Sequence, residues 1–136
     1  MPLFPAKTKF RKSQRRRLRG RATVGSRLTF GEFGLQALEC VYLTTNQIEA
    51  ARKALTHYLK RGGKVWVRAF ADKIVTAKAA ETRMGGGKGV PAGFSAPLKR
   101  GHIIFELAGI SLDDAKEALR LAGYKLPLKT RFVVKQ

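Results

Sequence analysis

The first 31 residues of this chain of 136 contain ten lysines and arginines but no aspartate or glutamate. A segment with so much unbalanced positive charge repels itself and cannot build a folded core of its own. We therefore expect an extended basic arm over residues 1–27, ordered by a polyanion, and a single folded domain over residues 28–136. The ten basic residues are Lys7, Lys9, Arg11, Lys12, Arg15, Arg16, Arg17, Arg19, Arg21 and Arg27.

Seven of these ten cations are arginines, and this choice indicates which polyanion the arm binds. The planar guanidinium group binds phosphate through two hydrogen bonds and stacks on nucleobases. A helix lying on a membrane would place large apolar residues opposite its charges, but residues 11–21 contain only Leu18. The arm is therefore predicted to bind nucleic acid, with a solvated basic tail as the alternative.

The composition of the whole chain excludes other classes of protein. The formal net charge is +19, with one cysteine and two histidines, which are too few for an internal disulfide or a four-ligand zinc site. No apolar run approaches the roughly 20 residues that a bilayer span needs. The basic N-terminus lacks the apolar core of a secretory signal, so we expect it to be part of the mature protein.

Beyond residue 27, hydrophobic periodicity predicts interspersed strands and helices. Residues 35–43 alternate in polarity as a strand does, although Glu39 falls on the apolar side. Further strands are predicted at residues 64–70, 103–107 and 130–135. Capping signals and glycines predict one helix from Thr44 to Gly62-Gly63 and another from Ser111 to Gly123. These elements predict an α+β fold with a mixed or antiparallel sheet and two main helices.

The first predicted helix has a basic face as well as an apolar stripe. Lys53, His57, Lys60 and Arg61 recur at helical spacing, and no acidic residue lies between positions 49 and 72. A merely solvated charged face usually carries alternating ion pairs. We therefore interpret this face as one that contacts RNA, with a solvated face as the alternative.

The single tryptophan, Trp66, lies in the predicted strand at residues 64–70, on the same side as Arg68 and Phe70. An exposed tryptophan can stack on a nucleobase. A lone tryptophan in a strand is more often part of a core, so we expect Trp66 to be buried, with base stacking as the alternative.

Residues 83–93 are the least ordinary segment, because five of these eleven residues are glycine. A P-loop requires Ser or Thr after Gly-Lys, but Gly89 follows Lys88, and the glycine spacing of dinucleotide-binding loops is absent as well. We expect a flexible loop that presents Arg83 and Lys88 and lets its backbone approach phosphate closely, with a disordered linker as the alternative.

No group of residues predicts catalysis. Cys40 and His57 lack a third group that would orient them, and Asp113 and Asp114 are explained as partners of a helix N-terminus. We therefore predict no enzymatic activity, catalytic residue, metal, cofactor or small-molecule substrate, and no membrane partner.

Six motifs, in order along the chain, resemble the bacterial-type large-subunit ribosomal protein sixteen family. They cover nearly the whole chain. The motifs are Thr8–Lys12, Phe30–Leu35, Gln47–Arg52, Gly63–Arg68, Thr82–Gly85 with Gly87–Gly89, and Lys125–Thr130.

This resemblance implies a structural ribosomal protein with an α/β hammerhead-like fold, bound to large-subunit rRNA near the A site beside other large-subunit proteins. It implies that the arm threads into rRNA and that the glycine loop reaches tRNA at the A and P sites. The residues expected to bind rRNA are Lys7, Lys9, Arg11, Lys12, Arg15, Arg16, Arg17, Arg19, Arg21, Arg52, Lys53, Lys60 and Arg61. Those expected near tRNA are Arg83, Met84, Gly85, Gly86, Gly87, Lys88 and Gly89.

Two departures from the family pattern bear on the loop and on the compartment. Gly86 stands where the family usually has lysine, which removes one loop cation. The run Pro91–Phe94 looks more like mitochondrial members than bacterial ones, so a mitochondrial ribosome is favoured over a bacterial or plastid one. The alternative function is that of a free-standing architectural nucleic-acid-binding protein.

Overall fold

The computed structural model describes residues 4–136, which form two antiparallel sheets and two helices. The predicted α+β fold is confirmed. The strands are β1 (Phe33–Ala37), β2 (Val41–Thr44), β3 (Lys64–Val67), β4 (Lys73–Ala77), β5 (Val90–Leu98), β6 (Ile103–Ala108) and β7 (Thr130–Val134). The helices are α1 (Thr45–Leu59) and α2 (Leu112–Gly123).

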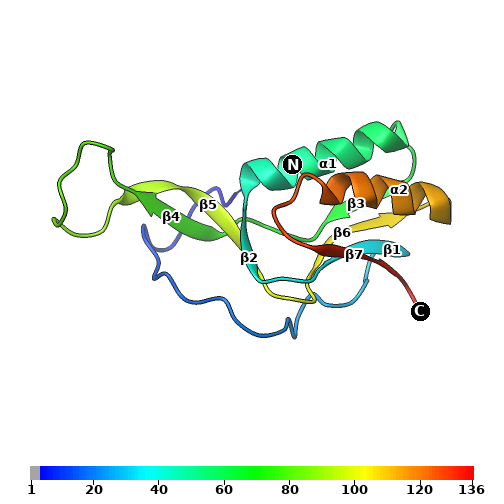
Figure 1. Ribbon diagram of the computed structural model, residues 1–136, viewed down its shortest axis with the longest axis horizontal. Helices are drawn as coiled ribbons and strands as arrows, with labels where there is room; N and C mark the ends of the chain where they lie inside the picture. The colour runs from blue at the N-terminus through cyan, green and yellow to red at the C-terminus, as the bar shows by residue number, and fades with distance from the viewer. Residues whose placement is uncertain (1–3) are drawn as a thin grey trace.

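The first sheet has the strand order β3-β6-β1-β7, and both helices lie together over one of its faces (Figure 1). Apolar side chains from the sheet and the helices meet there and leave water, which is the main driving force for folding. Leu55 of α1, Phe105 of β6 and Leu119 of α2 are fully buried in this core. The core therefore fixes the position of β6.

The second sheet has the strand order β2-β5-β4, and its long β4–β5 hairpin extends away from the helices (Figure 1). The loop between these two strands, residues 78–89, stands at the far end of the molecule. The N-terminal arm runs past the hairpin and then beneath the first sheet. Arm and loop are thus brought to the same side of the fold.

Local capping signals predict both helices, and the structure confirms them. The Thr44 hydroxyl accepts the backbone N–H of Gln47, whose side chain accepts the backbone N–H of Thr44, so the capping box is complete. Ser111 accepts the backbone N–H of Asp114 at the start of α2. The first helix ends before the glycine pair, because Lys60 itself adopts the left-handed conformation.

The prediction of one continuous strand over residues 35–43 is wrong. The chain turns in the middle of this segment and passes from one sheet into the other. The Leu38 backbone N–H donates to the Lys129 carbonyl at 2.9 Å, and the next two residues are exposed. β1 pairs with β6 and β7, whereas β2 pairs with β5. Glu39, which interrupts the apolar side of the sequence pattern, lies at this turn.

The sequence does not predict β4 and β5, and part of the expected glycine loop belongs to β5. Proline and glycine are rare inside strands, since proline lacks a donor and glycine has no side chain to pack. Here Pro91 and Gly93 are accommodated beside an irregularity of register between Val75 and Thr76 of β4. The loop therefore covers residues 78–89 instead of 83–93, because β4 ends at Ala77 and β5 begins at Val90.

No helix within residues 4–136 is both long and apolar enough to cross a membrane.

Candidate nucleic-acid interface

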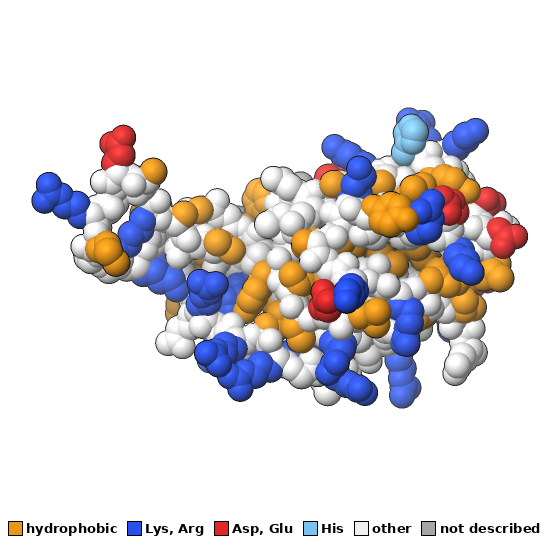
Figure 2. All heavy atoms as spheres, viewed as in Figure 1, with side chains coloured by type: hydrophobic (Ala, Val, Ile, Leu, Met, Phe, Trp, Pro, Cys, Tyr) orange, Lys and Arg blue, Asp and Glu red, His pale blue; other side chains and the backbone are white. Residues whose placement is uncertain are grey.

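The arm exposes every one of its cations. All ten basic residues between Lys7 and Arg27 are solvent-exposed, and the segment forms no helix or named strand. Figure 2 shows lysine and arginine side chains along the lower edge of the molecule, where the arm runs in Figure 1, with few acidic side chains among them. This edge can bind a chain of phosphates without first losing ion pairs of its own.

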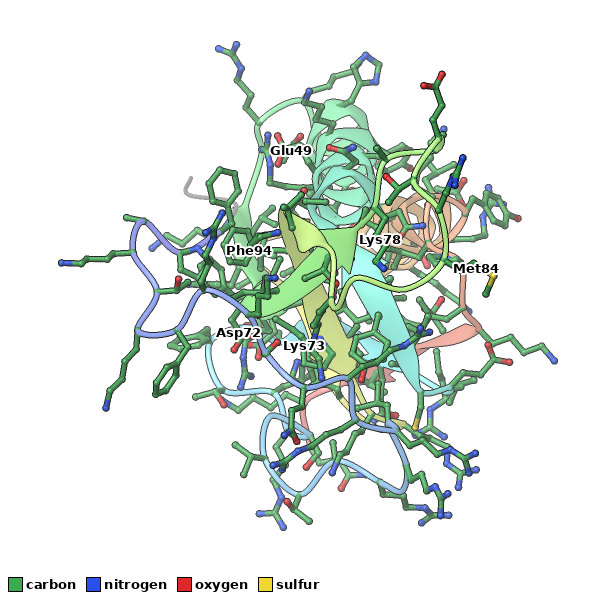
Figure 3. The ribbon with its side chains drawn as sticks, turned by 90° about the vertical axis from the view of Figure 1, so that its left-hand side faces the viewer. Glu49, Asp72, Lys73, Lys78, Met84 and Phe94 are labelled. Atoms are coloured by element: carbon green, nitrogen blue, oxygen red, sulfur yellow. The ribbon has the colours of Figure 1, made fainter. Side chains whose placement is uncertain are left out.

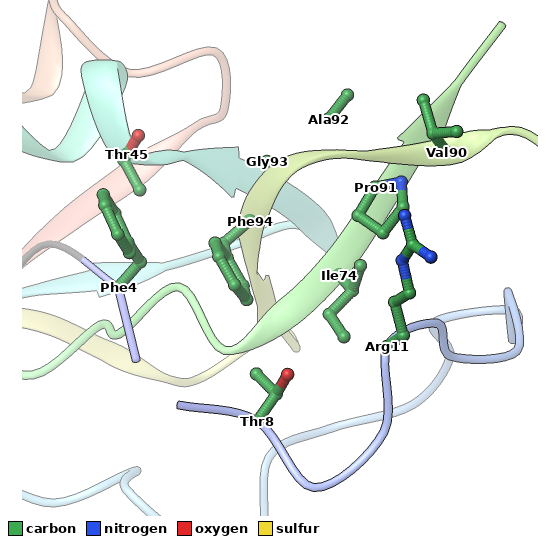
Figure 4. A pocket seen from close by; sticks show the side chains of 10 residues that line it. All are labelled: Phe4, Thr8, Arg11, Thr45, Ile74, Val90, Pro91, Ala92, Gly93 and Phe94. Atoms are coloured by element: carbon green, nitrogen blue, oxygen red, sulfur yellow. The ribbon is translucent and has the colours of Figure 1, made fainter. Parts of the chain in front are cut away.

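The first half of the arm lies against the second sheet. Phe4 stacks on Phe94 of β5, with ring centroids 5.4 Å apart and ring planes 5° from parallel (Figure 4). Arg11 lines the same hollow, beside Pro91. Further along, the Tyr42 hydroxyl donates to the Arg16 carbonyl at 2.7 Å. These contacts use arm backbone and apolar groups, and they leave the guanidinium of Arg16 free for a ligand.

Two lysines connect the arm to the base of the glycine loop. Lys12 Nζ donates to the Lys88 carbonyl at 3.1 Å, and Lys88 Nζ donates to the Ser13 carbonyl. The Ser13 hydroxyl in turn lies 3.5 Å from the Ile74 carbonyl of β4. Lys88, which the sequence predicts to be a loop cation near tRNA, therefore also holds the arm to the hairpin.

The second half of the arm runs along β6. The Ala22 N–H donates to the Arg100 carbonyl, the Ile103 N–H to the Gly25 carbonyl, and the Glu32 N–H to the Leu107 carbonyl, at 2.8–2.9 Å. A parallel bridge also joins Arg21 to Arg100. Residues 21–32 are thus docked on the folded part, whereas the sequence predicts an extended arm as far as residue 27.

A buried carboxylate fixes the end of the arm. Glu106 of β6 is fully buried and accepts the backbone N–H groups of Phe30 and Gly31 at 2.7 Å and of Thr29 at 3.2 Å. It also forms an ion pair with Arg68. Burial of the carboxylate raises its pKa, but Arg68 and the three N–H donors together outweigh burial, so the pKa of Glu106 lies below its usual value.

Sequence reasoning misses Glu106 and Arg68 as functional partners. In the sequence, Glu106 merely interrupts an apolar run from residue 103 to residue 110. A charged residue inside a buried strand requires a partner and hydrogen bonds, so the interruption itself was the available signal. Its partner lies 38 positions away, which no local pattern indicates.

His102 lies beneath the docked arm. Gly25 passes so close that a Cβ on it would lie 2.9 Å from the His102 ring, and Nε2 has no hydrogen-bond partner among residues 4–136. Burial lowers the pKa of His102, and the charge of Arg68 lowers it further, whereas the backbones of Arg68 and Val24 act in the opposite direction without outweighing burial. The neutral imidazole therefore suits this site.

We expect the folded state to lose stability as the pH falls below about 6.5. His102 takes up a proton more readily in the unfolded chain than in the folded one, because its folded pKa is lowered, so acid favours unfolding. Urea unfolding at pH 7.5 and pH 5.5 measures this loss. The variant His102→Gln should show a smaller loss over this interval. An equal loss in wild type and His102→Gln would contradict the assignment.

The four residues predicted for the basic face of α1 are exposed, but only Lys53 and His57 lie within the helix. Lys60 and Arg61 follow its end, both with positive φ. Arg52, which the family resemblance adds to the expected rRNA contacts, forms a bidentate ion pair with Glu49, and this hydrogen-bonded pair lowers the pKa of Glu49. The charge of Arg52 is therefore already partly neutralised within the helix.

Arg83 and three glycines of the glycine loop lie in open solvent. Residues 83–88 are exposed, and Cβ atoms on Gly85, Gly86 or Gly87 would meet nothing within 4 Å. All three glycines have positive φ, which other residues rarely adopt. Lys78 Nζ donates to the Gly85 carbonyl at 2.6 Å and so stabilises the loop. The Met84 side chain points away from the folded domain (Figure 3). The tip is therefore open to an external partner.

No catalytic arrangement is present among the described residues. The Cys40 thiol donates to the Gly20 carbonyl at 3.4 Å rather than facing a base. Asp114 bonds to Ser111 at the N-terminus of α2 and faces no basic pocket. Within residues 4–136, no group of three or more His, Cys, Asp or Glu side chains could hold a metal ion.

Comparison with known proteins gives a consistent family. The family model described as "Ribosomal protein L16p/L10e" matches residues 5–133. The chain is 55% identical over 134 residues to "Large ribosomal subunit protein uL16c" of Gracilaria tenuistipitata, across 98% of this chain and 99% of the relative. It is 56% identical over 134 residues to "Large ribosomal subunit protein uL16" of Trichodesmium erythraeum (strain IMS101), across 98% of each. For "Large ribosomal subunit protein uL16c" of Porphyra purpurea the identity is 53% over 133 residues, across 98% and 96%.

These relatives are of plastid and cyanobacterial type, so they do not support the mitochondrial ribosome favoured by the Pro91–Phe94 run. The structure gives that run a local role. Phe94 stacks on Phe4, and Pro91 lines the hollow beneath the arm.

Proposed function

This chain belongs to the ribosomal protein L16p/L10e family and is a structural, non-enzymatic constituent of the large ribosomal subunit, in which we propose that it binds rRNA near the A site and helps to position tRNA. Its partners are rRNA and neighbouring large-subunit proteins, and contact with tRNA at the A and P sites is part of the proposal. By analogy with its relatives, the ribosome is a plastid or bacterial one.

One observation supports the rRNA interface above all: the ion pairs that the structure describes lie within the folded part, and none reaches the arm. Glu49, Glu106 and Glu117 each form an ion pair with an arginine of the folded part. None of the arm's ten cations has an acidic partner among residues 4–136. Gathering so many like charges is costly unless phosphates neutralise them, and RNA supplies phosphates at the required density.

Three surfaces divide the proposed work. The arm would anchor the protein through Lys7, Lys9, Arg11, Lys12, Arg15, Arg16, Arg17, Arg19 and Arg21. The face of α1 would dock the folded part on rRNA through Lys53, Lys60 and Arg61, with Arg52 as a weaker contributor because of its ion pair. The loop from Arg83 to Gly89 would extend toward tRNA.

Sedimentation separates this function from that of a free-standing architectural nucleic-acid-binding protein. We expect the native protein to migrate with large ribosomal subunits at moderate salt and to leave them only when salt screens the phosphate contacts. A protein that stays at the top of the gradient at moderate salt would contradict the ribosomal role.

For the loop, we expect Arg83→Ala to weaken A-site tRNA binding about tenfold while incorporation into subunits stays nearly intact. Arg83 is exposed at the tip, and the loss of one charge-assisted contact to phosphate is worth about 1.5 kcal/mol. Filter binding of tRNA to reconstituted subunits measures the effect.

The matched control is Lys116→Ala, which removes an exposed cation from α2 and should leave tRNA binding unchanged. Lys88→Ala is expected to weaken tRNA binding and also to loosen the arm, because Lys88 Nζ binds the Ser13 carbonyl. If Arg83→Ala impaired assembly as strongly as loss of the arm, the proposed division of work would be wrong.

A further inference from the structure

The outer face of β3 combines cations with an aromatic ring. Side chains alternate along a strand, so Lys64, Trp66 and Arg68 point to one side and Val65 and Val67 to the other. The two valines pack against the hydrophobic core, whereas Trp66 does not belong to it. The expectation that Trp66 is a core residue is therefore wrong, and its ring is available for another purpose.

Phe30 covers this tryptophan and remains largely open to solvent. The two rings are stacked, with centroids 6.1 Å apart and planes 20° from parallel. The Arg68 guanidinium carbon lies 5.5 Å from the centroid of the Phe30 ring. Both neighbours come from the same side of β3, yet the Phe30 side chain is 58% exposed. The side of its ring that faces away from the strand is thus free.

The ring is held in place although it is exposed. The Phe30 backbone N–H donates to the buried Glu106 carboxylate at 2.7 Å, and so does that of Gly31. A Cβ on Gly31 would lie 2.5 Å from the Leu107 carbonyl, so the chain is pressed directly onto β6 here. Arg68 is fixed by the same carboxylate and by a 3.1 Å bond to the Arg27 carbonyl. A preorganised ring loses little entropy when a ligand stacks on it.

The charges around the ring favour an anionic ligand. Lys64, on the same side of β3 as Trp66, is exposed and has no acidic partner among residues 4–136. The acid at this site, Glu106, is buried and already bound by Arg68. An aromatic platform beside a free cation suits a base with its neighbouring phosphate better than an apolar peptide.

We propose that the open face of Phe30 stacks on an unpaired RNA base, while Lys64 binds a phosphate beside it. The proposal rests on the rRNA-binding function above and adds a nucleotide-level site to it. Stacking needs only the π-face of a base, so the site would accept any base, with purines preferred for their larger surface.

The test uses the full chain and a short single-stranded RNA carrying 2-aminopurine, whose fluorescence is quenched by stacking. Phe30→Leu keeps apolar bulk but removes the ring, and it should weaken binding about 5- to 100-fold and abolish the quenching. Phe30→Tyr should restore both. Because no charge changes, the dependence of affinity on salt should be the same in all three proteins. Phe70→Leu, which alters another exposed phenylalanine, should behave as wild type.

The outcomes separate this site from the general function. If wild type and Phe30→Leu bind the RNA equally well, the stacking site is rejected while rRNA binding stands. If wild type binds neither this RNA nor rRNA, both proposals fail. If Phe30→Leu binds RNA normally but its reconstituted subunits lack a neighbouring protein, the ring is a protein contact and the base-stacking proposal is overturned. Unchanged thermal unfolding of Phe30→Leu shows that any loss of binding is local.

Discussion

Replacing eight arm cations by glutamine is expected to reduce rRNA affinity by several orders of magnitude at physiological salt. Each phosphate contact contributes roughly 0.7–0.9 to the slope of log affinity against log salt, so eight contacts contribute about six. The variant retains Lys12, because its ammonium group holds the Lys88 carbonyl. The substituted residues are Lys7, Lys9, Arg11, Arg15, Arg16, Arg17, Arg19 and Arg21.

This charge variant separates the effect of charge from that of packing better than a truncation of the arm does. Truncation would also remove the Phe4–Phe94 stack and the acceptor for the Tyr42 hydroxyl, so it would mix lost charge with lost packing. The glutamine variant keeps the backbone carbonyls of Ser13 and Arg16 that the folded part uses. Its circular dichroism and thermal unfolding should therefore stay close to those of wild type.

Lysines outside the arm provide the control. Lys116, Lys125 and Lys129 are exposed, and their replacement by glutamine should change the slope far less for each residue removed. Titration of an rRNA fragment at four or more salt concentrations gives both slopes. Equal slope changes per residue would mean that the arm acts only through overall charge and is not the anchor.

The sequence predicts the elements whose signals are local. The capping box of Thr44 and Gln47 and the cap of Ser111 lie within four residues of the helices that they begin, and both helices form as predicted. Strands 103–107 and 130–135 are confirmed for a similar reason, since their apolar residues face one core.

The sequence does not predict features that depend on distant partners. β2 and β4 pair with β5. Pro91 and Gly93 make β5 resemble a loop in the sequence, so the second sheet is not predicted. Trp66 lies outside the core because Val65 and Val67 face it, and Phe30, 36 positions earlier, stacks on the tryptophan ring. The cations of the arm could be predicted from charge alone, but the contact between Lys88 and the arm could not, because it requires the hairpin to exist.

The largest effect on stability is expected for Glu106→Gln, at about 3 kcal/mol or roughly 10 °C in Tm. The substitution leaves Arg68, whose side chain is 18% exposed, without its counter-charge and weakens the acceptor of three backbone N–H groups. The stability that Glu106 supplies should also disappear in acid. Because its folded pKa is lowered, the contribution is present above its unfolded value of about 4.5 and is lost as the pH falls through the folded pKa. Urea unfolding at several pH values measures both effects.

Glu117→Gln is the matched control, because it breaks an exposed ion pair with Arg120 on α2 and should destabilise the fold far less than Glu106→Gln. A second comparison separates the ion pair from the backbone contacts. Arg68→Met combined with Glu106→Gln removes both charges but keeps an oxygen that accepts the N–H groups, so it should be more stable than Arg68→Met combined with Glu106→Leu, which leaves three buried donors unsatisfied. If the two double variants were equally stable, Glu106 would serve only Arg68. The docking of residues 29–31 on β6 would then depend on their packing and not on the carboxylate.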